Sequence, residues 1–400
     1  MTKFYYLRIV LPLIIVVIVG CGKIQPNVTY IDTNANGEIE YDLTEALQNK
    51  SVSFLDDMID SIKIIPLDSD QQSLFSMIWN IEVSSKNIYI QDNSRIIIFN
   101  QLGKFIKSLD KGPGPKEIGH PRAMSFDEKT KCLYVYDGIG SKIMKFTEEG
   151  HFLSYYPMPS LPIRDIAVSD TLLFFAHHGM NNNFAISVGD TVFNNINTYV
   201  FGSDHYFFLF RKYLMPYDGG FNVKKLLDNK IYYLKDTLVR AKYLLKYPMM
   251  NVQYSQYNSI NELDSDIPAD EFLFSGDYLE SKDYLFTIFK TNGFDSGFSF
   301  KTLLTHKATG KSVCFEGKPH SLISFISIES IVCGNNNWFV GIIYPESFAA
   351  TKIDNEYYWD GSNPCNLLSE DEMRKLRAVD EEDNPIVVLF KLKEFPSFLE

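Results

Sequence analysis

The chain has few basic residues and lacks the common catalytic motifs. Lys and Arg number 38 against 50 Asp and Glu, which gives a formal net charge of −12. An acidic chain without a concentrated basic stripe is not expected to bind nucleic acid. The sequence contains no Gly-x-Ser-x-Gly elbow, no His-Glu-x-x-His pair and no dinucleotide-binding fingerprint. The motif-borne chemistries of serine hydrolases, zinc peptidases and dinucleotide-dependent enzymes are therefore not indicated.

Cysteine is scarce as well. The five cysteines are Cys21, Cys132, Cys314, Cys333 and Cys365. None lies in a Cys-x-x-Cys pair or at a metal-finger spacing, so no zinc site is indicated. Two alternatives remain for these cysteines in an oxidising compartment: a Cys314–Cys333 disulfide, or buried free thiols on strands.

The N-terminal apolar run is too short to cross a membrane. Ile9–Val19 spans only ~16 Å as a helix, against a hydrocarbon core of ~30 Å. Lys3 and Arg8 precede the run, and the small residue Gly20 with Cys21 follows it. A basic start, a short apolar core and a small residue before the cut predict a signal peptide over residues 1–20.

One block of sequence occurs twice, at an offset of about 45 residues that is typical of β-propeller blades. Residues 86–106 read KNIYIQDNSRIIIFNQLGKFI, and residues 131–153 read KCLYVYDGIGSKIMKFTEEGHFL. The matching pairs are Tyr89 and Tyr134, Asp92 and Asp137, Arg95 and Lys142, Phe99 and Phe146, Gly103 and Gly150, and Phe105 and Phe152. Each copy predicts a strand, a turn at the aspartate, a second strand, a turn ending in glycine, and a third strand, which is the body of one blade.

Further blades are predicted over 162–212, 221–260, 270–316 and from 321 to 392. The segment 52–67 reads as strand, short helical turn and strand, and its second strand is expected to pair with the last blade, because a closed ring leaves no open sheet edges. Ser369 and Glu372 predict a capped helix over 369–377. Dividing the chain by the repeat length favours seven blades as an alternative.

Several segments resemble a known family. Ile64–Asp68, the loop Gly112–Glu117 and Asn384–Lys393 are similar to the six-bladed β-propeller lipoproteins, NHL-like propellers of Gram-negative bacteria. The resemblance implies an all-β, six-bladed propeller of four-stranded antiparallel blades over 46–400. Residues 18–21 also resemble a lipobox, which implies acyl chains on Cys21, a polar tether over 21–45 and a place at the outer membrane. No acidic residue directly follows Cys21, which favours the side facing the periplasm.

The candidate ligand-binding residues lie on predicted turns and loops. Lys111 opens a Gly-Pro-rich loop that we interpret as a rigid connection between blades at the channel mouth, and Arg122 follows it within reach of an anionic ligand. Asp92 and Asp137 occupy equivalent blade positions, which favours bonds to turn amides over catalysis. His177 is adjacent to His178, and neighbouring side chains on a strand point to opposite faces, so a shared metal is disfavoured.

These observations favour a binding or scaffold protein over an enzyme. We expect a periplasmic, membrane-tethered propeller without a cofactor, whose ligand is an envelope protein, a peptide or a glycan. The alternative is a propeller hydrolase or lyase that holds a divalent metal in its central channel. Elemental analysis of the purified protein discriminates between the two.

Overall fold

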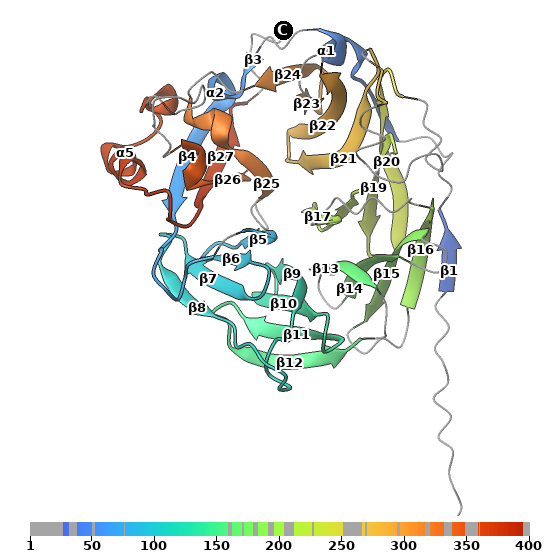
Figure 1. The fold of residues 1–400 in the computed structure, drawn as a ribbon. Helices are drawn as coiled ribbons and strands as arrows, with labels where there is room; N and C mark the ends of the chain where they lie inside the picture. The colour runs from blue at the N-terminus through green and yellow to red at the C-terminus, as the bar shows by residue number, and fades with distance from the viewer. Residues whose placement is uncertain are drawn as a thin grey trace, which may run out of the picture.

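Six β-sheets radiate from a central axis among the described residues of the computed structural model (Figure 1). The structure describes residues 27–31, 38–49, 53–75, 77–158, 162–169, 172–178, 183–190, 196–203, 212–225, 228–250, 266–268, 270–293, 297–316, 321–331, 338–348, 359 and 361–394. The predicted six-bladed propeller is confirmed, and the seven-bladed alternative is wrong. The expected signal peptide, Cys21 and Cys333 lie outside the described residues.

The first two strands of each blade lie nearest the axis (Figure 1). The innermost strands of blades 1 to 6 are β5 (Asn80–Val83), β9 (Pro121–Asp127), β13 (Ile163–Ser169), β17 (Leu214–Tyr217), β21 (Leu273–Glu280) and β25 (Ser327–Ile331). The second strands are β6 (Asn87–Gln91), β10 (Cys132–Asp137), β14 (Leu172–His178), β18 (Gly220–Val223), β22 (Tyr284–Gly293) and β26 (Phe339–Ile343).

The remaining strands form the outer part of the ring. The third strands are β7 (Ile96–Asn100), β11 (Lys142–Thr147), β15 (Asn183–Asp190), β19 (Lys230–Lys235), β23 (Gly297–His306) and β27 (Ile386–Leu392). The fourth strands are β8 (Phe105–Ser108), β12 (Phe152–Pro157), β16 (Ile196–Ser203), β20 (Leu238–Lys246), β24 (Ser312–Glu316) and β4 (Ile59–Pro66). Blade 4 therefore begins at β17, upstream of the predicted residue 221, because its short, proline-containing first strand carries little strand signal.

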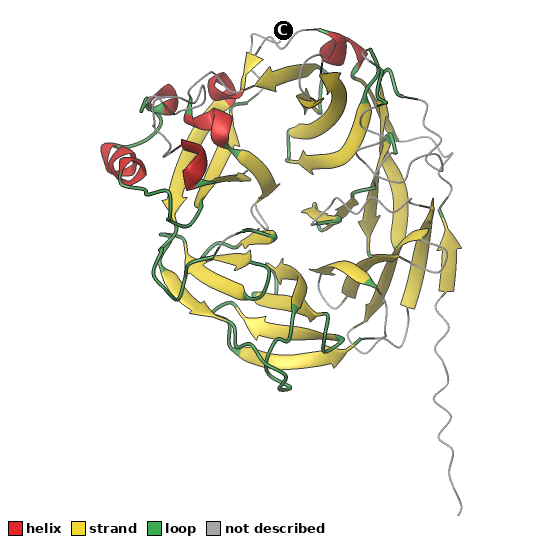
Figure 2. Cartoon of the chain, in the orientation of Figure 1, coloured by secondary structure: helices red, strands yellow, loops and turns green. Residues whose placement is uncertain are grey.

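Short helices decorate the ring, most of them around blade 6 (Figure 2). They are α1 (Thr44–Gln48), α2 (Leu55–Met58), α4 (Pro345–Phe348), α5 (Glu370–Arg377) and the 3-10 turns η3 (Leu322–Phe325) and η4 (Pro364–Asn366). The predicted capped helix is confirmed: Ser369 and Glu372 form both bonds of the capping box. The predicted strand–turn–strand over 52–67 is also confirmed as β3 (Ser53–Phe54), α2 and β4.

Both faces of each blade are buried against neighbouring blades. In β6, Ile88 and Ile90 join a core cluster with Val340 of blade 6. Tyr89, on the opposite face of the same strand, joins a cluster with Phe126 of blade 2. Successive strand residues point to opposite faces, so a strand buried on both sides reads as a continuous apolar run. This is why the two repeat copies are so apolar.

The ring closes by pairing strands from the two ends of the chain. β4 is antiparallel to β27, with Val387 opposite Ile65 and Val388 opposite Ile64. Blade 6 thus takes its outermost strand from the N-terminal part of the chain, as the sequence predicted. The closure leaves no open seam between the first and last blades.

The N-terminal segment also runs around the outside of three consecutive blades. β1 (Asn27–Tyr30) pairs in parallel with β16, β2 (Ile39–Asp42) with β20, and β3 with β24. We call these three strands the N-terminal belt. Two of them fall within the tether expected over 21–45, so the described part of that segment is hydrogen-bonded to the blades.

We expect the second belt strand to contribute strongly to stability. Tyr41 is only 3% exposed, its ring centroid lies 5.3 Å from that of Tyr243, and its hydroxyl donates to the Lys307 carbonyl at 3.2 Å. Tyr41→Ala should lower the free energy of unfolding by about 3–5 kcal/mol, measured by urea denaturation. Tyr30→Ala, at a belt position 74% exposed, should change it by less than about 0.5 kcal/mol. Equal effects would show that the belt does not pack as described.

Candidate functional site

The innermost strands of blades 1, 2 and 3 begin around a cavity of about 270 Å³, which we call the mouth cavity. Trp79 precedes β5, His120 precedes β9, and Arg122 and Arg164 are the second residues of β9 and β13. Each blade has the same strand order, so these strand starts lie at the same end of the channel. The ring therefore brings together side chains that are far apart in the sequence.

Positive charge predominates in the mouth cavity. Arg122 and Arg164 both line it, and Arg122 has no hydrogen bond or ion pair within the part of the chain that the structure describes. Asp92 is the one carboxylate that the described residues contribute to the lining, and it is engaged by its own turn. Its Oδ1 accepts from the Ser94 and Arg95 amides at 2.6 and 2.8 Å, and its Oδ2 from Arg95 Nε at 3.1 Å. The arrangement suits an anion.

His120 adds a titratable group to the same cavity. Burial lowers the pKa of His120 below its ordinary value, and the charge of Arg122 lowers this pKa further, while Asp137 opposes the shift. Asp137 also holds the backbone beneath the imidazole, because its Oδ1 accepts from the His120 amide at 2.9 Å and its Oδ2 from the Gly119 amide at 3.0 Å. The imidazole is thus neutral at neutral pH and becomes a third cation on acidification.

Gln91 contributes a buried acceptor to the mouth cavity. Its Nε2 donates to the Pro121 carbonyl at 3.2 Å. Because a carbonyl can only accept, this bond fixes which end of the amide is the nitrogen. The Oε1 atom is buried and has no hydrogen-bond partner among the described residues, and Gln91 as a whole is 4% exposed. Buried acceptors are normally satisfied, so the unpaired Oε1 is an unusual feature of this lining residue.

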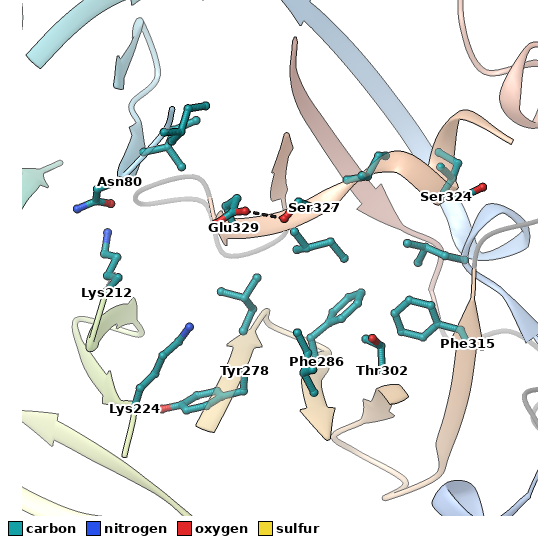
Figure 3. Close-up of a pocket in the computed structure, with 18 of the residues that line it drawn as sticks. Asn80, Lys212, Lys224, Tyr278, Phe286, Thr302, Phe315, Ser324, Ser327 and Glu329 are labelled. Carbon is teal, nitrogen blue, oxygen red and sulfur yellow. Dashed lines mark hydrogen bonds between the residues drawn. The ribbon is translucent and has the colours of Figure 1, made fainter. Parts of the chain in front are cut away.

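A second cavity of about 470 Å³ reaches from the channel between blades 5 and 6 and shares Trp79 with the mouth cavity (Figure 3). Its walls are largely apolar, with Phe286 and Phe315 among them. Polar groups lie toward the axis, where Lys212 and Lys224 extend from the side of blade 4 (Figure 3). We call this the side cavity.

Buried charges join three blades at the axis. Lys212, beside β17, forms an ion pair with Glu82 of β5, and both side chains are almost fully buried. Asp165 of β13 accepts from the Tyr213 and Leu214 amides at 2.7 and 2.8 Å. Burial raises the pKa of Asp165 to about 6, against the opposing charge of Lys212. These contacts fix the inner strands of blades 1, 3 and 4 relative to one another next to the mouth cavity.

Only some of the candidate residues predicted from the sequence line the mouth cavity. Asp92 and Arg122 both line the mouth cavity, whereas Asp137 does not line it but accepts from the amide of the lining residue His120. Lys111 is exposed on the linker between blades 1 and 2 and lines neither cavity. His177 is buried within blade 3, where its Nε2 is 2.8 Å from Ser187 Oγ, and it also lines neither cavity.

The repeated aspartate is followed in both copies by a cation that holds a linker. Lys142 Nζ donates to the Gly114, Pro115 and Glu117 carbonyls at 3.1, 3.4 and 2.9 Å. At the equivalent position Arg95 donates to the Gln72 carbonyl at 2.9 Å and to the Leu74 carbonyl. The cation thus fixes the linker that precedes its own blade, which agrees with the interpretation of Lys111–Glu117 as a rigid connection.

Sequence reasoning missed Trp79, Gln91 and Arg164. A signal existed for Arg164, because Pro121-Arg122 and Ile163-Arg164 open the innermost strands of consecutive blades. No local pattern marked the other two residues.

Two kinds of feature are absent from the described residues. No group of three or more His, Cys, Asp or Glu residues there could hold a metal ion. No helix of the described residues is long and apolar enough to cross a membrane.

The fold and the site define a six-bladed propeller with a cationic channel mouth. The chain belongs to the family described as domain of unknown function DUF4934, whose model matches residues 38–391. No curated protein matches it. A solved structure from Bacteroides fragilis NCTC 9343, described as an exported protein, is 15% identical with a TM-score of 0.67, covering 89% of this chain and 99% of its own. A DUF4221 member from Bacteroides vulgatus ATCC 8482 is 9% identical with a TM-score of 0.51, covering 84% and 98%.

Proposed function

We propose that this protein is a non-catalytic binding propeller that takes an anionic small ligand into the mouth cavity. The observation that carries the proposal is the convergence of Arg122 and Arg164, from consecutive blades, in a cavity where the one carboxylate among the described lining residues is already bonded. A concave site with a few convergent polar groups is the usual form of a small-molecule site.

The proposal places the protein at the outer membrane, facing the periplasm. The support is the signal-peptide pattern over residues 1–20 and the lipobox-like cysteine, Cys21. The B. fragilis protein of the same fold is described as exported. Acyl chains on Cys21 would hold the ring at the membrane surface, with the belt beginning a few residues further on.

Titration calorimetry of the mature chain tests the proposed ligand class. We expect sulfate and monocarboxylates to bind with one site per chain, and we expect the affinity to fall with added chloride, since chloride competes and salt screens the arginines. Neutral analogues of the same size should bind at least tenfold more weakly. The proposal is overturned if no anion binds at a concentration of about 10 mM, because a dissociation constant above that value is too weak for a specific site.

Anion affinity should rise as the pH falls. Because the pKa of free His120 is lowered by burial and by Arg122, protonation occurs below the ordinary histidine range, and a bound anion raises that pKa again. Binding therefore takes up a proton, and affinity for a carboxylate should be about tenfold higher at pH 5 than at pH 7.5.

His120→Gln is the control for this pH dependence, and its calorimetric affinity should be nearly constant over the same pH range. A wild-type affinity that does not change with pH would show that the imidazole does not face the ligand.

A further inference from the structure

We propose that the ligand of the mouth cavity is a polyhydroxylated acid, namely an acidic monosaccharide unit such as a uronic acid. This inference rests on the proposed anion-binding function and names its ligand class. It is carried by groups that a simple anion would leave unused.

The first such group is the side-chain carbonyl of Gln91. Its Oε1 is buried and has no partner among the described residues, and Nε2 is already committed to the Pro121 carbonyl. A carboxylate or sulfate carries no donor at neutral pH, so it would leave this acceptor unsatisfied. A ligand hydroxyl would satisfy it once the Gln91 side chain turns Oε1 toward the mouth cavity. The ligand therefore carries at least one donor beside its acidic group.

The second such group is the indole of Trp79, which is 41% exposed although it lines both cavities. The Trp79 amide donates to the Gln91 carbonyl oxygen of the backbone at 2.8 Å. This bond holds the two residues side by side, with Trp79 just before β5 and Gln91 at the end of β6. A flat apolar surface beside polar groups matches a sugar ring, which has apolar C–H faces and a hydroxyl edge.

The size of the cavity agrees with a single ring. A volume of about 270 Å³ lies near the lower end of the ~300–1,000 Å³ that is typical of small-molecule sites. A lone sulfate would fill little of this space, and a peptide of several residues would exceed it. A six-membered ring can place its carboxylate at the arginines, its C–H face at Trp79 and a hydroxyl at Gln91.

Three matched probes test the inference by calorimetry on the mature chain. D-glucuronate carries both the carboxylate and the hydroxyls, cyclohexanecarboxylate keeps the ring and the carboxylate alone, and D-glucose keeps the hydroxyls alone. We expect D-glucuronate to bind at least tenfold more tightly than either of the others. If both acids bind equally, the sugar assignment is overturned while the anion site stands. If neither acid binds, the anion site itself is overturned.

Two variants locate the recognition. Gln91→Met should weaken D-glucuronate at least tenfold and leave cyclohexanecarboxylate unchanged, since the substitution removes the acceptor of the ligand hydroxyl and, within the protein, the bond to the Pro121 carbonyl. Equal weakening of both acids would contradict the role of Oε1. If this variant fails to fold, Trp79→Leu, at a partly exposed position, should lower D-glucuronate affinity at least fivefold without changing sulfate affinity. An acidic peptide that binds more tightly than D-glucuronate would also overturn the inference.

Discussion

Arg122→Met is expected to lower anion affinity at the mouth cavity by about 10- to 100-fold, because a hydrogen bond to a charged group contributes about 1.5–3 kcal/mol. Arg164→Met should have a similar effect, since both arginines line the cavity from equivalent strand positions. Calorimetry with a monocarboxylate measures both affinities. The thermal midpoint of Arg122→Met should stay within about 2 °C of wild type, since Arg122 is exposed and has no hydrogen bond among the described residues.

Arg374→Met is the matched control, because it removes the same charge from α5. The side chain of Arg374 is 78% exposed, and the residue lines neither cavity. Anion affinity should be unchanged in this variant. If Arg374→Met weakened binding as much as Arg122→Met, the effect would reflect the charge of the whole protein rather than a site. Arg122→Lys should restore part of the affinity, because it keeps the charge but loses the two-pronged geometry.

Glu280→Ala should be the most destabilising single substitution among the charged residues, lowering the free energy of unfolding by about 3–5 kcal/mol. The side chain of Glu280 is fully buried and accepts from Lys242, Lys307 and Tyr243 at 2.6 to 2.9 Å. Without it, two buried ammonium groups from blades 4 and 5 would face one another. Urea denaturation measures the loss.

The pH dependence of this loss follows from the charge on Glu280. Burial favours the neutral acid, but Lys242 and Lys307 hold the pKa of Glu280 below its ordinary value. A carboxylate whose pKa is lowered on folding stabilises the folded state at pH values above its unfolded pKa. This contribution is lost as the pH falls through the folded pKa. The difference between Glu280→Ala and wild type should therefore be largest near neutral pH and shrink in acid.

Glu40→Ala is the control for burial. Glu40 forms an ion pair with Lys246 at 2.5 Å, with side-chain exposures of 49% and 52%, and it also joins the belt to blade 4. Such an exposed pair is expected to contribute less than about 1 kcal/mol. If both glutamate variants lost similar stability, the Glu280 cluster would not be the buried junction between blades that we describe.

The parts of the fold that the sequence predicted are those with repeated or strongly apolar signals. Asp92 and Asp137 bond the turn amides that follow them, so the blade body is visible as a repeat. β4 was predictable because four large aliphatic residues pair it with β27. The N-terminal belt was not predictable from the sequence, because its strands have only two to four residues and because Val28 and Tyr30 are exposed. Short strands with exposed side chains carry little periodicity.

The site was predictable only in part, for a geometric reason. Asp92 belongs to the first clear repeat copy, and Arg122 follows the loop Gly112–Glu117 just before the second copy, so their place on the channel face could be inferred. The meeting of Arg164 with Trp79 and Gln91 depends on how blades 1 and 3 come together around the axis, which no local pattern encodes. The repeat signal also fades in blade 3, where Arg164 lies. His177 shows the opposite case, since a conspicuous histidine pair proved to lie within a blade.

The most direct test of the account is a crystal structure of the mature chain grown with saturating D-glucuronate. We expect the ligand in the mouth cavity, with its carboxylate oxygens about 2.7–3.2 Å from the guanidinium nitrogens of Arg122 and Arg164. A carboxylate bound in the side cavity, or an empty mouth cavity in the presence of the ligand, would contradict it.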